Sequence, residues 1–221
     1  MGIDYNYIIS IFEVSIPYLK ITIVIALLGF TLAIIVSILL AVVNENKIRI
    51  LYPISKLYVS FFRCTPIMSQ LFFFYYGFAQ VSETIRTMQP VIALILIIGL
   101  NYASFMSETI RGAFLSVAKS QKDAGLACGM TSFQIAKRII LPQAIRTALP
   151  GLMNSFIGIL KSTSLGFTVG AIEFMTRAKI EATNNVRFFE GYLVILVVYW
   201  IVIAFFVFWQ KKLEIKLNNM Y

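Results

Sequence analysis

Residues 21–44 read ITIVIALLGFTLAIIVSILLAVVN and contain no aspartate, glutamate, lysine or arginine. A helix of about 20 apolar residues, rising about 1.5 Å per residue, is long enough to cross the hydrocarbon core of a membrane. Three more stretches free of these charges, 64–82, 87–107 and 191–210, are 19, 21 and 20 residues long. The chain is therefore predicted to be an all-α integral membrane protein.

The composition agrees with that fold class. Of 221 residues, 59% are hydrophobic and only 13% are charged, which is about half the charge of a typical soluble domain. Helices buried in a large soluble core are the alternative, but they would leave too little polar surface to face water. There is no histidine, so histidine-based catalysis and histidine metal sites are excluded. Cys64 and Cys128 are far apart and are interpreted as small hydrophobic residues.

A fifth stretch, 147–172, is interrupted only by Lys161 and contains several glycine, hydroxyl and amide residues. It is predicted to be an irregular span. The whole chain, 1–221, is expected to form one transmembrane domain with about five helices. The spans are expected at roughly 17–43, 57–80, 88–110, 148–171 and 191–210, with a coupling loop at 112–147.

The distribution of basic residues predicts the orientation. With the N-terminus outside and the C-terminus inside, 13 of the 19 lysines and arginines fall in the inside segments and five in the outside ones. Cytoplasmic loops carry such an excess of basic residues. The first residues, with Asp4 and Glu13 and no basic stretch, favour an N-terminus outside over a cleaved signal peptide.

Two segments between the spans have a predicted structure of their own. Residues 52–62 should form a short interfacial helix, followed by a new helix with Thr65 as N-cap and Pro66 in its first turn. The loop 112–147 should form a helix–turn–helix, in which Gly129 ends the first helix in the left-handed conformation. Capping boxes are expected at 120–123 and 131–134.

The faces of this hairpin can also be predicted. The first helix should present small and apolar residues at its tip, and the second should bury Phe133, Ala136, Ile139 and Ile140. Pro142 should stop the second helix and Pro150 should open the fourth span. Such a hairpin suits docking into a partner, whereas an ordinary loop and a DNA-binding motif are the alternatives. Sparse basic residues disfavour nucleic acid as a partner.

Residues 123–129 (DAGLACG), followed after nine residues by 139–142 (IILP), resemble the E-A-A-x-x-x-G-x9-I-x-L-P loop of permease subunits of bacterial ATP-binding-cassette importers. Asp123 stands where that family prefers glutamate, and Gly125 where it prefers alanine. Residues 62–72 (FRCTPIMSQLF), 107–112 (SETIRG) and 161–165 (KSTSL) are similar to stretches of its polar amino acid branch.

The resemblance implies a multi-pass permease subunit in the bacterial inner (plasma) membrane, paired with a second copy or a paralogue. It also implies a cytoplasmic ATPase dimer and an extracytoplasmic amino acid binding protein as partners. The coupling role would fall to Asp123, Ala124, Gly125 and Gly129. The chain has no phosphate-binding loop of the G-x-x-x-x-G-K-[ST] type, so it is expected to need no cofactor itself, with ATP and magnesium bound by the ATPase.

Polar residues inside spans are costly, and they mark the expected transport pathway. Lys161 could face a substrate carboxylate, or it could instead snorkel or pair with Glu108, while Glu108 and Arg111 can pair on one helix face. Any single polar residue could equally be a helix–helix contact. The candidate substrate-binding residues are Gln70, Asn101, Asn154, Ser155, Lys161, Ser162 and Thr163.

Many members of the polar amino acid branch carry aspartate where Ser162 stands, and its absence argues against a cationic substrate. Residues 161–169 (KSTSLGFTV) look most like those of cystine-type permeases, so cystine is the expected substrate and glutamine an alternative. A secondary transporter or channel that works without an ATPase is the alternative function. A membrane enzyme is disfavoured, because no set of catalytic residues faces a common site.

Overall fold

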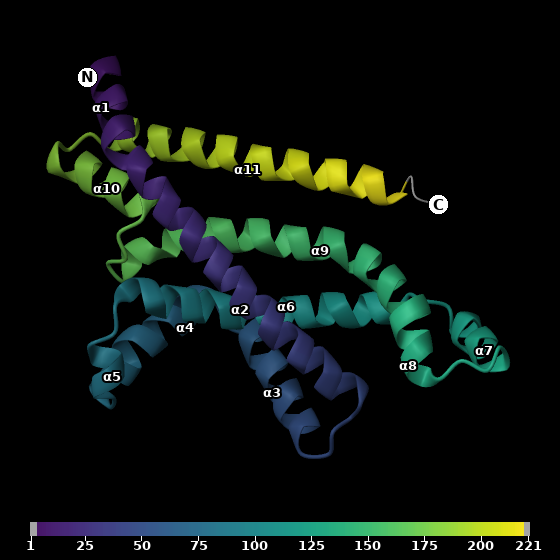
Figure 1. Ribbon diagram of the computed structural model, residues 1–221. Helices are drawn as coiled ribbons and strands as arrows, with labels where there is room; N and C mark the ends of the chain where they lie inside the picture. Colours follow the sequence, from purple (N-terminus) through teal and green to yellow (C-terminus); the bar gives the residue numbers. More distant parts are fainter. Residues whose placement is uncertain (1–3, 219–221) are drawn as a thin grey trace.

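The computed structural model describes residues 4–218, and the regular elements of that part are all helical (Figure 1). The α-helices are α1 (Tyr5–Ser15), α2 (Leu19–Glu45), α3 (Leu51–Cys64), α4 (Ile67–Phe72), α5 (Glu83–Arg86), α6 (Pro90–Leu115), α7 (Lys119–Ala127), α8 (Ser132–Ile135), α9 (Leu141–Ser162), α10 (Phe174–Asn184) and α11 (Phe188–Asn218). The predicted all-α fold class is confirmed.

Three helical stretches of the described chain are long and apolar enough to cross a membrane: Tyr5–Glu45, Pro90–Leu115 and Phe188–Lys216. They contain the stretches expected at 17–43 and 191–210 and overlap the one expected at 88–110, which begins two residues before Pro90. The other two expected spans, 57–80 and 148–171, are each divided between several helical elements. Their passage through the membrane, and the orientation of the chain, stay predictions.

The first division falls at Thr65 and Pro66. A break was expected here, but Thr65 is not an N-cap: it ends α3 with φ −113° and ψ 144°, and Pro66 is the N-cap of α4. Proline forces the residue before it out of the α conformation. The Thr65 hydroxyl therefore turns back and donates to the carbonyl of Phe61 at 2.7 Å.

The second division differs from the prediction. Pro142 does not stop a helix but lies in the first turn of α9, and Pro150 lies inside α9 rather than opening it. A π-helical turn, Ala136–Ile140, joins α8 to α9. A proline near a helix start leaves no needed N–H unpaired, and the π-turn re-spaces the backbone before it. After Ser162 the chain continues as a 3₁₀ turn, Thr163–Thr168.

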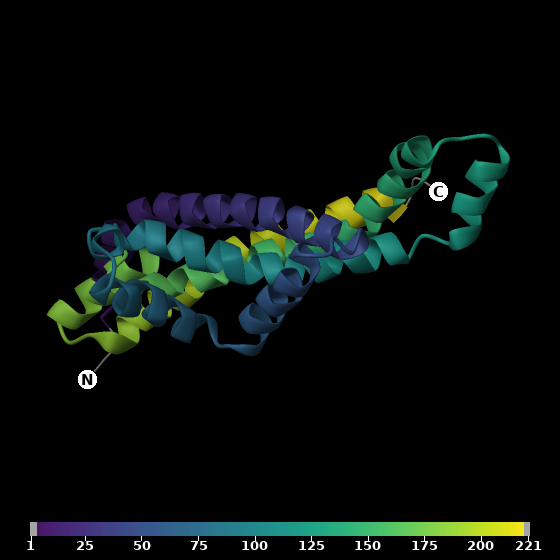
Figure 2. The same cartoon turned by 90° about the horizontal axis from the view of Figure 1, so that it is seen from below.

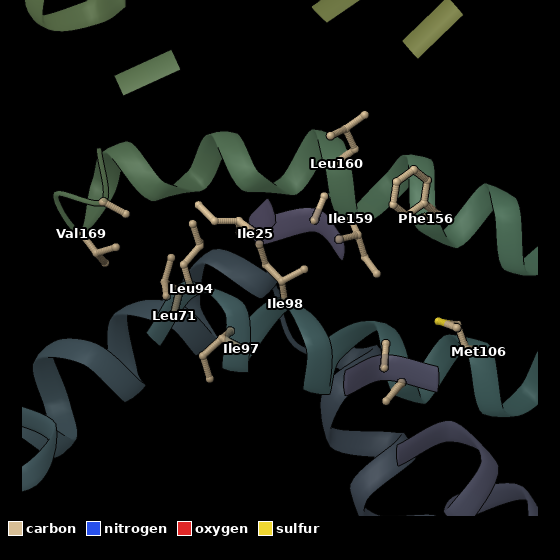
Figure 3. Packing of buried hydrophobic residues seen from close by; sticks show 14 residues of the cluster. Ile25, Leu71, Leu94, Ile97, Ile98, Met106, Phe156, Ile159, Leu160 and Val169 are labelled. Carbon is tan, nitrogen blue, oxygen red and sulfur yellow. The ribbon is translucent and has the colours of Figure 1, made fainter. Parts of the chain in front are cut away.

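The core lies where α2 crosses α6 and α9, which run side by side (Figures 1 and 3). Ile25 of α2, Ile98 of α6 and Ile159 of α9 are almost fully buried there. By contrast, large apolar side chains such as Leu39 and Trp200 are 60% and 72% exposed, as expected of faces that meet lipid. The pair α7–α8 projects from one end of the bundle, and α10 lies at the other (Figure 2).

Candidate functional site

The projecting hairpin α7–α8 is the first candidate site. Its turn contains Gly129 at φ +74°, the predicted left-handed helix end that glycine adopts without strain. The predicted capping box of α8 is present: the Thr131 N–H donates to the Gln134 side chain at 2.9 Å, and the Gln134 N–H donates to the Thr131 hydroxyl at 3.3 Å. The box expected at 120–123 is wrong, because α7 begins at Lys119 after Ala118, which has no capping side chain.

The surface of the hairpin is partly as predicted. Asp123, Ala124 and Gly129 are exposed, whereas Gly125 is buried. A Cβ at Gly125 would lie 2.8 Å from Cγ1 of Ile135, so glycine lets α7 approach α8 more closely than alanine would. This close approach explains the departure from the alanine of the family motif.

The predicted inner face of α8 is wrong in two positions. Phe133 is 73% exposed and Ala136 is also exposed, whereas Ile135 is 1% exposed. The π-turn that follows α8 changes the helical phase, so Ile135 and Ile139, rather than Phe133, meet Gly125. The exposed Phe133 leaves a large apolar side chain at the end of the molecule.

The break between α3 and α4 is the second candidate site. Gln70 Nε2 donates to the carbonyls of Phe62 and Thr65 at 3.2 and 3.1 Å, and Asn101 Nδ2 donates to the carbonyl of Phe62 and to Gln70 Oε1, both at 3.0 Å. These two amides thus cap the last carbonyls of α3, which no helical partner can reach. Of the predicted substrate-binding residues, the structure brings only these two together in this way.

The remaining predicted substrate-binding residues lie on or after α9. Asn154 accepts from Gln210 at 3.1 Å, and the Ser155 hydroxyl donates to the carbonyl of its own helix at 3.0 Å. Ser162 shares a hydrogen bond of 3.1 Å with the hydroxyl of Tyr102 on α6. Thr163 is buried, and its hydroxyl donates to the carbonyl of Leu160 at 2.8 Å.

Lys161 is exposed on α9. Among the described residues it makes no ion pair, and Glu108 instead binds Arg111 at 2.6 Å. The expected Glu108–Arg111 pair is thus present on α6, whereas the alternative pair between Lys161 and Glu108 is not seen in this part of the chain. Lys161 therefore keeps its charge available at the surface of the single chain.

Sequence reasoning missed Tyr102 and Glu173. Glu173 is fully buried and accepts hydrogen bonds from the Thr22 hydroxyl at 2.8 Å, the Thr176 N–H at 2.9 Å and the Tyr199 hydroxyl at 3.2 Å. These donors come from α2, α10 and α11. The signal available in the sequence was a lone acid directly after a long apolar stretch, where it could cap the next helix.

Long apolar helices with a projecting helical hairpin are typical of a multi-pass membrane protein. Residues 33–219 match the family described as "Binding-protein-dependent transport system inner membrane component". The chain belongs to that family, and it is a multi-pass protein of the inner membrane. The resemblance to permeases of ATP-binding-cassette importers is confirmed.

Two relatives show how far the similarity extends. The chain is 41% identical over 221 residues to the probable amino-acid ABC transporter permease PatM of Vibrio harveyi, covering 100% of this chain and 99% of PatM. It is 32% identical over 220 residues to the L-cystine transport system permease TcyL of Bacillus subtilis, covering 98% and 92%. A solved amino acid ABC transporter crystallised with histidines has the same fold, with TM-score 0.90, 24% identity and coverage of 98% and 100%.

Proposed function

We propose that this permease translocates a polar amino acid, with cystine as the best candidate, in an ATP-driven importer. The proposal is carried by two relatives named as probable amino-acid permeases, PatM of Vibrio harveyi and YxeN of Bacillus subtilis. Each is 41% identical to this chain over nearly the full length of both chains. Two further relatives at 32% and 33% identity, TcyL and TcyB, are named for L-cystine. Glutamine stays the second candidate, because permeases named for it are 30% identical.

The mechanism proposed is alternating access driven from the hairpin. A cytoplasmic ATPase dimer, which binds ATP and magnesium, would hold α7 and α8, and its closure would move them. A second permease copy or a paralogue would complete the pathway, and an extracytoplasmic binding protein would deliver the substrate. The permease contributes different affinities for substrate in its two states, since an equal affinity would couple nothing.

The contacts that join α7 to α8 and to α9 support this mechanism. Gln121 on α7 binds Gln143 on α9 at 3.2 Å, and Ile135 is buried against Gly125. A force applied at the exposed tip would therefore be transmitted to α9, which carries Lys161 and Ser162.

The test is uptake of labelled L-cystine by proteoliposomes that contain the permease together with its proposed ATPase and binding protein. Accumulation should require ATP, and Gly129→Trp should abolish it while the chain still inserts, because a side chain at φ +74° distorts the turn of the docking hairpin. Gly112→Trp is the matched control: its Cβ also meets nothing within 4 Å, but its φ is negative. Accumulation driven by a proton or sodium gradient without ATPase would instead show a secondary transporter.

A further inference from the structure

A cavity of about 630 Å³ lies between the last turns of α2 and α6 and the first half of α9, and we call it the α2–α6–α9 groove. Ala136, in the π-helical turn before α9, also lines it. The groove therefore lies at the end of the bundle from which α7–α8 projects (Figure 2). None of the candidate substrate-binding residues lines it, so its ligand has to be found from the groove itself.

The walls of the groove are apolar side chains that the single chain leaves open. Ile38 and Val42 of α2 and Ile145 of α9 all line the groove, and each is about half exposed. The volume lies within the range of sites for small molecules, which are mostly lined by apolar side chains. A contiguous exposed apolar surface of this kind marks a binding site, and its ligand should be largely apolar.

The length of the groove corresponds to one leaflet of a membrane. Lining residues extend from Ile34 to Glu45 on α2 and from Leu141 to Leu152 on α9. At about 1.5 Å per residue, each wall is about 16 Å long. The hydrocarbon core of a bilayer is about 30 Å thick, so an acyl chain of one leaflet spans about half of it. The groove and such a chain are therefore of similar length.

The charges of the groove lie at the level expected for lipid head groups. Of the lining residues only Glu45 and Arg111 are charged. Glu45 directly follows the charge-free stretch 21–44, and Arg111 lies four residues after the charge-free stretch 87–107. Charged residues at the ends of apolar spans lie at the membrane interface. The groove thus combines charges of both signs at the interface with apolar walls deeper in the membrane.

Both charged residues can bind a ligand. Arg111 donates through Nε and one Nη to Glu108 at 2.9 and 2.6 Å, whereas a guanidinium has five N–H donors. Its other donors have no acceptor among residues 4–218. Glu45 is exposed, makes no ion pair in the described part of the chain and lies within electrostatic range of Arg111. Charge-assisted bonds would therefore form from Arg111 to a phosphate and from an ammonium group to Glu45.

A helix from a second copy of the chain fits the groove less well than a lipid does. A helix about 10 Å across would fill 630 Å³ with roughly 8 Å of its length, or about five residues. A phospholipid instead combines a thin apolar chain with a phosphate and an ammonium group at one end. That is the arrangement of apolar walls and charges in the groove.

We propose that the α2–α6–α9 groove binds an acyl chain of a zwitterionic phospholipid with a primary ammonium group. Arg111 binds the phosphate, the ammonium group donates to Glu45, and the chain lies against Ile38 and Ile145. Lipid tails elsewhere in the membrane are equally apolar, so the head group decides which lipid binds. Because Ala136 lines the groove, the bound lipid contacts the junction between the α7–α8 hairpin and α9.

The first experiment locates the lipid. The full-length permease in detergent micelles is photolabelled with a phosphatidylethanolamine that carries a diazirine in one acyl chain, and the labelled residues are identified by peptide mass spectrometry. The label should concentrate on the groove residues of α2 and α9. Ile38→Trp fills the groove and should remove most of this label. Leu39→Trp adds the same side chain at an exposed position that does not line the groove, and it should leave the label in place.

The second experiment measures the head-group preference by competition with unlabelled lipids of identical acyl chains. In the wild type, phosphatidylethanolamine should displace the groove label at about tenfold lower concentration than phosphatidylglycerol, which has no ammonium group, as expected for a charge-assisted bond. Glu45→Gln should remove this difference. Glu13→Gln neutralises an exposed acid that does not line the groove and should preserve it. Each ratio compares two lipids on one variant, so a loss of folded protein cancels.

The phosphate contact is tested in the same way with phosphatidylethanolamine and a diacylglycerol, which has no phosphate. The wild type should prefer the phospholipid, and Arg111→Gln should reduce that preference about tenfold. Arg63→Gln is the matched control, because it removes the same charge from an exposed residue that does not line the groove. Its preference should equal that of the wild type.

Label spread evenly over the exposed apolar faces of α2 and α11 would overturn the proposal, as would head-group ratios that are the same in wild type, Glu45→Gln and Arg111→Gln. Light scattering tests the second copy as occupant. If the groove takes no label, and Ile38→Trp but not Leu39→Trp converts a dimer into a monomer, a second copy covers the groove and the proposal is wrong. ATP-dependent uptake tests the proposed function independently of these results.

Discussion

Gly158 allows α9 to approach α6 at the hydroxyl of Tyr102. A Cβ at this position would lie 2.6 Å from Tyr102 Oη and 2.8 Å from its Cε1. Gly158→Ala should therefore destabilise the protein by about 1–3 kcal/mol, the usual cost of overpacking, measured as thermal unfolding of the purified protein. Gly112→Ala, where a Cβ meets nothing within 4 Å, should be neutral or stabilising; an equal loss in both variants would contradict the packing argument.

Ser162 governs a second prediction at this scale. Its hydroxyl is 3.1 Å from that of Tyr102, which lines a cavity of about 310 Å³ at the break between α3 and α4. A carboxylate introduced by Ser162→Asp should attract cationic side chains, so lysine and arginine should compete with cystine uptake at least about tenfold better than in wild type. Ser164→Asp, in the adjoining 3₁₀ turn, serves as control. Unchanged competition profiles would remove Ser162 from the pathway.

The sequence predicts which polar residues lie inside spans, but not which hydrogen bonds they make. Gln70 and Asn101 were chosen because amides inside a span need partners, and the structure shows that most of those partners are carbonyls at the end of α3. Within residues 4–218, Asn101 Oδ1 accepts no hydrogen bond, whereas Gln70 Oε1 accepts one from Asn101. Which lone pair is free depends on the three-dimensional arrangement of two distant segments, and no spacing in the sequence reports it.

The hairpin α7–α8 shows what sequence can predict for an element. Gly129 and the capping box at 131–134 were predictable because both depend on neighbouring residues only. The inner face of α8 was not, because the π-turn Ala136–Ile140 shifts the helical phase. A periodicity argument assumes 3.6 residues per turn throughout and fails wherever that spacing changes.

Phe133 provides the prediction for this element. With 73% of its surface exposed, Phe133→Ala should leave thermal stability unchanged but reduce ATP-dependent uptake and co-purification with the ATPase, since aromatic residues often carry interface energy. Ile135→Ala, at a buried position of the same turn, should cost about 2–5 kcal/mol instead. Full coupling in Phe133→Ala would show that the ATPase does not contact this side chain.

At the scale of the whole molecule, Glu173 connects elements that are distant in the sequence. Its carboxylate accepts hydrogen bonds from α2, α10 and α11. The hydroxyl of Tyr199, one of these donors, is also 3.4 Å from the hydroxyl of Thr163 at the end of α9. Hydropathy predicted the three long apolar helical stretches Tyr5–Glu45, Pro90–Leu115 and Phe188–Lys216, while the number of spans stays a prediction. The assembly of their ends could not be predicted, because it depends on one buried acid whose partners come from three separate segments.

The orientation of the whole chain gives the last prediction. If the excess of basic residues marks the cytoplasm, the exposed Cys128 in the hairpin faces inside. In a Cys64→Ser variant, a membrane-impermeant maleimide should label Cys128 in inverted vesicles but not in intact cells.

Glu83→Cys, added to a Cys64→Ser/Cys128→Ser background, should show the opposite pattern, because α5 lies at the other end of the bundle and Glu83 is exposed (Figure 1). Labelling of Cys128 from outside would reverse the topology. The hairpin could then not meet a cytoplasmic ATPase, and the proposed coupling would be wrong as well.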